Sequence, residues 1–149
     1  MSLIANLFRK AIDENGKISL IRQTKPGGDG LACVAMIFMA HNSKESMTGL
    51  QKKYPQFSSG MSLKTIIDIF NQYGFVTRPL HCPRDEIQNI QHPCIVHWDM
   101  KQFVVLNGVD GGIFTVLNPA DKKSRYTKDE FEQHYSEVAL EVLANNNAL

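Results

Sequence analysis

The hydrophobic pattern of this chain changes its period at Gly74. Before this glycine, apolar residues recur every three to four positions, which is typical of helices. After it, they alternate with polar residues or run together in short segments rich in Val, Ile and Phe, which is typical of strands. A chain whose helices precede its strands is predicted to fold as an α+β domain. The length of 149 residues suits one domain, residues 1–149.

Helices are predicted over several segments before Gly74. Ser62 is placed to cap the last of them, and Gly74 follows its end. Residues 18–22 are short, apolar and suited to an extended segment, and the Pro- and Gly-rich residues 26–30 indicate a loop. The predicted helices cover residues 3–12, 31–41, 46–54 and 62–73.

Strands dominate the prediction after Gly74. Asp110 and Gly111 lie between two of them and indicate a hairpin turn. Thr127 and Glu130 match a capping box, so a short helix is predicted from there to near Tyr135. Another short helix is predicted over residues 83–90 because Pro83 suits a first helical position. The predicted strands cover residues 75–80, 93–98, 102–109, 112–117 and 138–143.

Composition excludes several classes of protein. The formal net charge is +1, which attracts no nucleic acid, so no nucleic-acid partner is expected. There are three cysteines, an odd number that does not indicate a disulfide framework, and a reducing compartment is predicted. The longest apolar stretch, residues 31–40, is far shorter than the ~20 residues that span a bilayer. The first residues lack the order of charged and apolar residues found in signal peptides.

Several short motifs occur in an order and spacing that resemble a known family. The motifs are Gln23 with residues 30–33 (Gly-Leu-Ala-Cys), then residues 60–63, 73–75, 93–98, 103–106, 118–120 and 138–142. Over residues 20–143 the chain resembles cysteine peptidase family 39, the N-terminal domain of ABC exporters that process bacteriocins with double-glycine leaders. The likeness is greatest to exporters of the colicin V type. This resemblance implies a papain-like α+β fold, with a helical half followed by an antiparallel sheet.

The catalytic positions of the family are altered in this chain. Family members place the catalytic cysteine six residues after an oxyanion-hole glutamine; Gln23 matches the glutamine, and Asp29 stands where the cysteine would be. The general-base histidine precedes Phe-Val-Val-Leu, and that position holds Gln102. The orienting aspartate precedes Pro-Ala, and that position holds Asn118. The resemblance therefore implies that the triad is degenerate and only Gln23 is kept.

These replacements predict a loss of peptidase chemistry. A cysteine peptidase needs a thiolate and a base that exchanges a proton near neutral pH. The amide of Gln102 supplies no such base, and Asn118 carries no charge to stabilise an imidazolium. General acid–base catalysis alone contributes about 10²–10⁴-fold in rate. The chain is therefore predicted to be no enzyme and to need no cofactor or metal.

Asp29 and Cys33 also have structural interpretations. Asp29 stands where a helix begins, and an aspartate cap there stabilises a helix by ~0.5–2 kcal/mol. Cys33 is a candidate for a displaced nucleophile. Because it lies four residues into an apolar helix, packing as a small hydrophobe is the favoured interpretation.

Other candidates are weaker. A group of metal-type side chains lacks the paired spacing of zinc ligands, and two of its members would face opposite sides of a strand. The single tryptophan, Trp98, either stacks on a ligand or fills a core, and both interpretations stay open. The metal-type group comprises His81, Cys82, His92, Cys94 and His97.

Three hypotheses about function follow from the resemblance. In the first, the domain binds a leader peptide or an exported polypeptide for a bacteriocin or toxin exporter. It would then work with transmembrane and ATPase domains on the cytoplasmic side of the bacterial inner membrane. In the second, it is an active leader peptidase that uses other residues. In the third, it only packs on transporter segments. Candidate contacts for an amphipathic leader helix are Met47, Leu50, Met61, Leu63, Ile66, Ile67 and Trp98.

Overall fold

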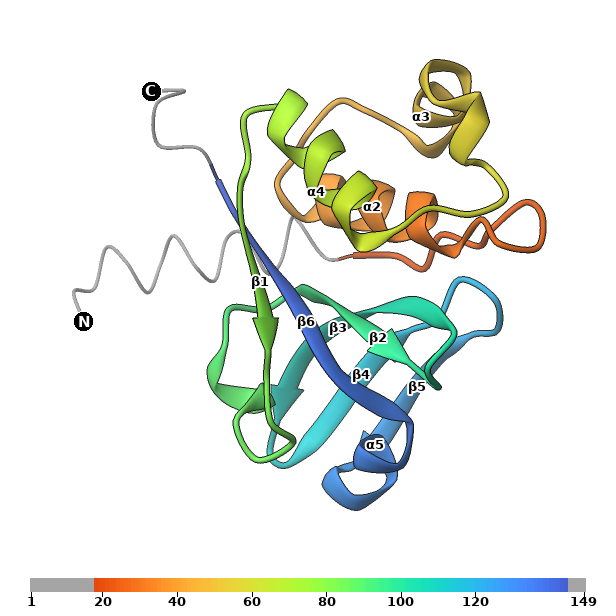
Figure 1. The fold of residues 1–149 in the computed structure, drawn as a ribbon. Coiled ribbons are helices and arrows are strands. Elements are labelled where there is room, and N and C mark those ends of the chain that lie inside the picture. The colour runs from red at the N-terminus through yellow and green to blue at the C-terminus, as the bar shows by residue number, and fades with distance from the viewer. Residues whose placement is uncertain (1–17, 145–149) are drawn as a thin grey trace.

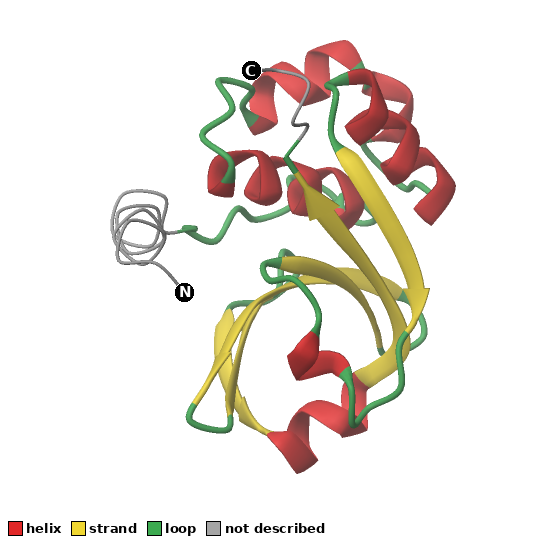
Figure 2. Cartoon of the chain, turned by 90° about the vertical axis from the view of Figure 1, so that its left-hand side faces the viewer, coloured by secondary structure: helices red, strands yellow, loops and turns green. Residues whose placement is uncertain are grey.

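The structure, a computed structural model, describes residues 18–144. It confirms the α+β fold with a helical half before the sheet. Three helices gather at one end of the molecule, and a strongly curved sheet with one short helix occupies the other (Figures 1 and 2). The helix predicted over residues 3–12 lies outside the described residues. Within the described range, no helix combines the length and the apolar character needed to cross a bilayer.

Helix α2 (Asp29–Ala40) is the centre of the helical half. Its residues from Gly30 to Phe38 are all buried, as expected for a helix with apolar residues on almost every face. It contacts strand β3 of the sheet as well as α3 (Met47–Lys53) and α4 (Leu63–Gln72). A helix covered on several sides in this way joins the two halves of the domain.

The two outer helices begin at serine caps. Ser46 Oγ accepts a hydrogen bond from the Gly49 N–H at 3.1 Å, and Ser62 Oγ accepts one from the Thr65 N–H at 3.2 Å. The cap predicted at Ser62 is therefore confirmed, and each bond satisfies an N–H that the helix leaves free. Between α3 and α4 lies the short 3₁₀ helix η1 (Pro55–Phe57). Gly74, with φ of 81°, follows α4 as predicted.

The sheet has six antiparallel strands in the order β1-β6-β2-β3-β4-β5. The last strand therefore lies between the first two, which brings the end of the described chain back beside the helical half (Figure 1). Five of the strands are those predicted from the sequence: β1 (Val76–His81), β2 (Cys94–Trp98), β3 (Gln102–Asp110), β4 (Ile113–Leu117) and β6 (Tyr135–Leu143).

The central strands supply two separate cores because successive side chains point to opposite faces. Ile95 and Val105 join the core formed with α2 and α4. Val96 and Val104 join a second core inside the curved sheet, which α5 (Lys128–His134) closes. Burial on both faces explains why these strands are continuous apolar runs rather than alternating ones.

Three local predictions are wrong. Strand β5 (Lys123–Thr127) was not predicted, because an exposed edge strand with charged residues has no apolar run. The hairpin turn is Gly111–Gly112 rather than Asp110–Gly111, since Asp110 pairs with Ile113 and both glycines have positive φ. Residues 83–90 form only the short 3₁₀ helix η2 (Ile87–Asn89), in which one residue is buried. The capping box that begins α5 is confirmed.

Candidate functional site

The three positions that the family resemblance assigns to the triad make two hydrogen bonds at adjacent residues of β3 (Gln102–Asp110), where the helical half meets the sheet. Asp29 is the first residue of α2, and its carboxylate accepts a hydrogen bond from the Phe103 N–H of β3 at 2.7 Å. Gln102, the preceding residue of β3, donates from Nε2 to Asn118 Oδ1 at 3.1 Å. Asn118 follows the end of β4. Tertiary packing thus joins positions 74 and 16 residues apart in the sequence.

The prediction that Asp29 caps α2 is wrong. The N-cap residue is Gly28, and no side chain makes a capping hydrogen bond there. Asp29 instead occupies the first turn, where its negative charge still complements the helix dipole. Its carboxylate is committed to the backbone of β3. Asp29 therefore fastens the helical half to the sheet, a role that local sequence does not reveal.

Gln23 lies close to one of these positions. Its backbone N–H donates to the Pro119 carbonyl at 3.0 Å, next to Asn118. The Asn118 side chain also accepts from the Ala120 N–H at 2.9 Å, which holds the loop after β4. Among residues 18–144, Gln23 Oε1 is the one buried side-chain polar atom without a hydrogen-bond partner. Most buried polar atoms in folded proteins are paired, so this unpaired acceptor is an exception within the described residues.

A family model matches nearly the whole chain. The model of the peptidase C39 family covers residues 17–147. The chain belongs to the peptidase C39 family. Curated relatives agree: a probable microcin secretion/processing ATP-binding protein of Escherichia coli is 33% identical over 140 residues, which are 91% of this chain and 20% of the relative. The colicin V secretion/processing ATP-binding protein of Escherichia coli is 33% identical over 126 residues, 85% of this chain and 18% of the relative. The chain thus spans about a fifth of the length of these relatives.

Solved structures show the same fold. A double-glycine motif protease from an AMS/PCAT transporter, in complex with the leader peptide, superposes with a TM-score of 0.78 at 20% identity, covering 87% of this chain and 94% of that one. The peptidase domain of Streptococcus ComA superposes with a TM-score of 0.74 at 20% identity, covering 85% and 98%. These likenesses confirm the family's fold for this C39 domain.

The thiols of this C39 domain lie away from solvent. Cys33, Cys82 and Cys94 are all buried and free. Burial, with a smaller contribution from Asp29, raises the pKa of Cys33 well above its usual value. Burial also raises the pKa of Cys82 and of Cys94. Cys33 lies in the core of the helical half, as its packing interpretation predicts.

We expect these thiols to be unreactive in the folded protein. A thiol reacts as a thiolate that reagents can reach, and both conditions fail here. Ellman's reagent should therefore titrate fewer than one thiol per native chain, and all three cysteines of the sequence after denaturation. Rapid native labelling that Cys33→Ala removes would contradict this placement of Cys33.

The interpretation of Trp98 as a ligand contact is wrong. Its ring is 2% exposed and lies in the second core. It stacks on His134 with ring centroids 4.9 Å apart and also contacts Phe131 and Tyr126. Trp98 therefore packs in the core between the curved sheet and α5, and its side chain is not exposed to a ligand.

The metal-type group does not form a cluster in the structure. Within residues 18–144, no three His, Cys, Asp or Glu side chains are placed to hold one metal ion. Cys82 and Cys94 pack in the second core, whereas the His97 ring packs against Phe103.

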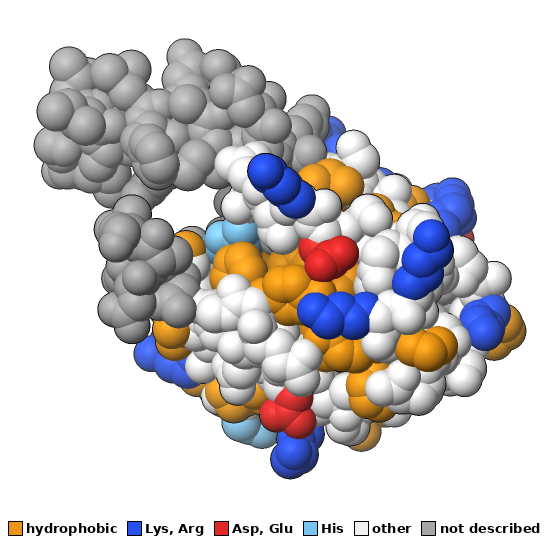
Figure 3. All heavy atoms as spheres, turned by 90° about the horizontal axis from the view of Figure 1, so that it is seen from above, with side chains coloured by type: hydrophobic (Ala, Val, Ile, Leu, Met, Phe, Trp, Pro, Cys, Tyr) orange, Lys and Arg blue, Asp and Glu red, His pale blue; other side chains and the backbone are white. Residues whose placement is uncertain are grey.

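The candidate leader contacts divide into two groups. Leu50 and Ile66 are 0% exposed, so their assignment to a docking surface is wrong. Met47, Met61, Leu63 and Ile67 are half-buried at the edge of the helical core. Seen from above, the helical half carries gathered apolar side chains interrupted by charged ones (Figure 3).

The sequence did not predict a pocket that is lined by Ile21, Met39 and Met47 together with polar residues. The signal was weak because its polar lining comes from the loop between α2 and α3, which has no motif. Sequence reasoning also missed the backbone N–H of Phe103 as the partner of Asp29.

Proposed function

We propose that this C39 domain holds a double-glycine leader or an exported polypeptide without cutting it, as part of an ABC exporter. The observation that carries the proposal is the identity of the catalytic positions. Asp29, Gln102 and Asn118 replace the triad that the family resemblance assigns, within a fold that is otherwise kept.

The bonding of these three residues supports a non-catalytic site. The Gln102 amide already donates to Asn118, and an amide neither accepts nor returns a proton near neutral pH. The Asp29 carboxylate already accepts from the Phe103 N–H. No thiol stands in their place, since Cys33 is buried and its pKa is raised by that burial. The side chains at these positions are thus bonded to other groups of the protein, and the site lacks a nucleophile–base pair.

Two features support peptide binding. The buried Gln23 Oε1 has no hydrogen-bond partner among the described residues, and an unsatisfied buried acceptor costs about 1–3 kcal/mol; a peptide N–H would recover this free energy if the Gln23 side chain turned outward to meet it. Met61 packs against the start of α2, since a side chain at Gly30 would meet its Cγ at 2.6 Å. Met61 therefore lies against Gly30, the residue that follows Asp29. One structural neighbour in this family was solved in complex with the leader peptide, which favours a similar ligand here.

The apolar part of the proposed docking surface is formed by Met61, Leu63 and Ile67. Leu63 and Ile67 are four residues apart on α4 and so lie on one face of this helix. The core face of α4 is formed instead by Ile66, Ile69 and Phe70, which are buried. Leu63 and Ile67 thus flank the core and remain half-buried, where an amphipathic helix can cover them.

The partners of the proposed function follow from the curated relatives, which are secretion/processing ATP-binding proteins. Transmembrane and ATPase domains would translocate the peptide, and this domain would present it from the cytoplasmic side of the membrane. Peptide affinity should be micromolar, which corresponds to about −8 kcal/mol, because a transporter must release its cargo.

A titration tests leader binding. A labelled double-glycine leader helix is expected to bind the wild-type domain and to bind Ile67→Asp at least about tenfold more weakly, a loss of about 1.4 kcal/mol. The matched control is Gln72→Asp, which introduces the same side chain at an exposed position of the same helix, five residues after Ile67 and therefore away from the face of Leu63 and Ile67. Little dependence on salt is expected because the contacts are apolar.

Three other outcomes are informative. Equal weakening by both variants, or binding that salt abolishes, would show that the surface is electrostatic. Absence of any binding and cleavage would favour a domain that only packs on transporter segments. Cleavage of the leader would favour the enzyme.

A further inference from the structure

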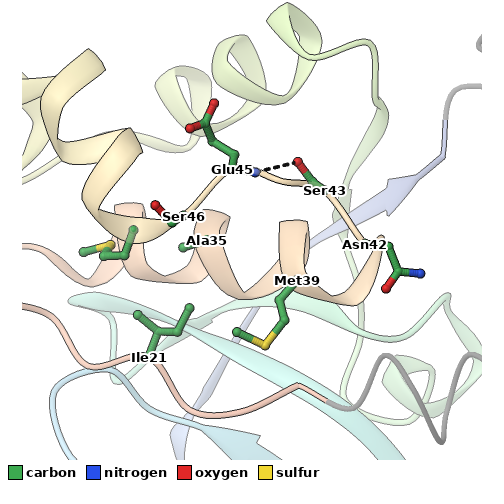
Figure 4. A pocket seen from close by; sticks show the side chains of 8 residues that line it. Ile21, Ala35, Met39, Asn42, Ser43, Glu45 and Ser46 are labelled. Carbon is green, nitrogen blue, oxygen red and sulfur yellow. Dashed lines mark hydrogen bonds between the residues drawn. The ribbon is translucent and has the colours of Figure 1, made fainter.

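A pocket of about 420 Å³ lies on the side of α2 where the described chain begins. Figure 4 shows Ile21 on the entering segment, Ala35 and Met39 on α2, and Asn42, Ser43, Glu45 and Ser46 on the loop that leads to α3. Met47, at the start of α3, completes the lining. The floor is apolar and the rim is polar, as in pockets that receive an apolar side chain from a mostly polar partner.

The chain enters the fold beside this pocket. Ile18 is 4% exposed and belongs to the core, and the Ser19 N–H donates to Met39 Sδ at 3.4 Å. Met39 lines the pocket. The residues that precede Ile18 are therefore tethered next to it. Residues 13–17 can span at most ~17 Å, so the connection is long enough for residues 3–12 to reach the pocket and short enough for an effective concentration on the order of millimolar.

Residues 3–12 have a sequence that requires a partner surface. Their apolar side chains recur at helical spacing and would form one face, whereas Asn6 and Arg9 would lie on the other. A helix of this length is marginal in water on its own and gains its stability from packing such a face. The apolar residues are Leu3, Ile4, Leu7, Phe8, Ala11 and Ile12.

The pocket matches this face in chemistry. Met39 and Met47 are flexible and polarizable side chains that adapt to large apolar groups such as Leu7 and Phe8.

We propose that the apolar face of residues 3–12 docks in this pocket of the same chain, with Leu7 and Phe8 entering between Met39 and Met47. The segment thereby covers the α2–α3 side of the helical half. This proposal does not depend on the proposed leader binding, which uses the surface of Met61, Leu63 and Ile67.

The methionine methyl groups report on the pocket in the full 149-residue chain. In methyl-labelled protein, Phe8→Asp is expected to shift the NMR signals of Met39 and Met47 and to leave those of Met61 and Met100 in place. Asn6→Asp is the matched control, since it adds the same carboxylate on the opposite face of the segment. Unchanged Met39 and Met47 signals in Phe8→Asp, or the same shifts in both variants, would overturn the proposal.

Dilution distinguishes docking of residues 3–12 within one chain from docking of the same segment of a second copy. The Met39 and Met47 signals of the wild type should be the same over a hundredfold dilution, because docking within one chain does not depend on concentration. Signals that move on dilution toward those of Phe8→Asp would show that a second copy supplies the segment, and would overturn docking within the chain.

A second measurement is independent of Phe8. A nitroxide reagent should label the thiol of Ser2→Cys selectively, because the native cysteines are buried. The attached spin label broadens the NMR signals of nearby methyl groups. It is expected to broaden the Met39 and Met47 methyl signals more than that of Met100, at the exposed tip between β2 and β3. Equal broadening of all three would place the segment elsewhere and reject the proposal.

Discussion

A double-glycine precursor peptide incubated with this C39 domain for a day is expected to remain uncut. The positions that the family resemblance assigns to the triad hold Asp29, Gln102 and Asn118, so on this assignment neither a thiolate nor an imidazole is present to attack the peptide or protonate the leaving amine. The rate should fall at least about 10⁴-fold below that of an intact cysteine peptidase, since general acid–base catalysis alone contributes about 10²–10⁴-fold. Mass spectrometry of the precursor measures the result.

The matched control restores the triad in place. Asp29→Cys, Gln102→His and Asn118→Asp together are expected to produce slow cleavage after the double glycine, because Gln23 is kept beside them to stabilise an oxyanion. Adding Gln23→Ala to this triple variant should remove about 10²–10³-fold of the restored rate. The restored rate should remain small, because Asp29→Cys also gives up the hydrogen bond to the Phe103 N–H.

Cys33→Ala decides between inactivity and a displaced nucleophile. Cleavage by the wild-type domain that disappears in Cys33→Ala would refute the proposed function and make Cys33 the nucleophile. The burial of Cys33 in the core of the helical half argues for the opposite result.

Ile66→Asp is expected to prevent folding, whereas the neighbouring Ile67→Asp leaves the domain folded. Ile66 is 0% exposed between α4 and α2, and the charge of an aspartate there would have no partner. Loss of the apolar side chain and burial of a carboxylate should together cost about 5 kcal/mol or more, which is comparable with the whole stability of a typical domain. Ile67 lies at the edge of the core, so its replacement should cost only about 1–2 kcal/mol.

Urea unfolding followed by circular dichroism measures both variants. Asn71→Asp, exposed on the same helix, should unfold at the urea concentration of the wild type. An Ile66→Asp domain that unfolds at the wild-type concentration would mean that α4 presents a different face to α2. For the same reason Ile66→Asp cannot test leader binding, whereas the folded Ile67→Asp domain can.

Much of the fold was predictable because it depends on local patterns. The change of period at Gly74 separates helices from strands, and each period reflects the geometry of one backbone conformation. Ser62 and Thr127 cap their helices as predicted, because a cap needs only neighbours within three residues. Strand β5 was not predicted because it contains an exposed lysine and an exposed arginine and has no run of apolar residues.

The candidate site was predictable only in part. Asp29, Gln102 and Asn118 were selected by a family resemblance, and their order in the sequence does not show that they meet. The structure brings them together through α2 packing on β3 and through the β3–β4 pairing. The assignment of Asp29 as a cap was wrong because its carboxylate accepts a hydrogen bond from the Phe103 N–H, 74 residues away, instead of from the N–H groups in the first turn of α2.

The sequence by itself determined where helices give way to strands and how the helices α4 and α5 begin, and with the family resemblance it assigned residues to the triad positions. Only the tertiary structure decided which apolar side chains are covered. Ile66 and Ile67 are equally hydrophobic neighbours, yet Ile66 faces α2 and Ile67 lies at the edge of the core. Trp98 lies in a core that forms only when the sheet curves and α5 closes it. Helical or strand period determines how side chains are spaced around an element, but the elements that pack against it determine which of them lose contact with water.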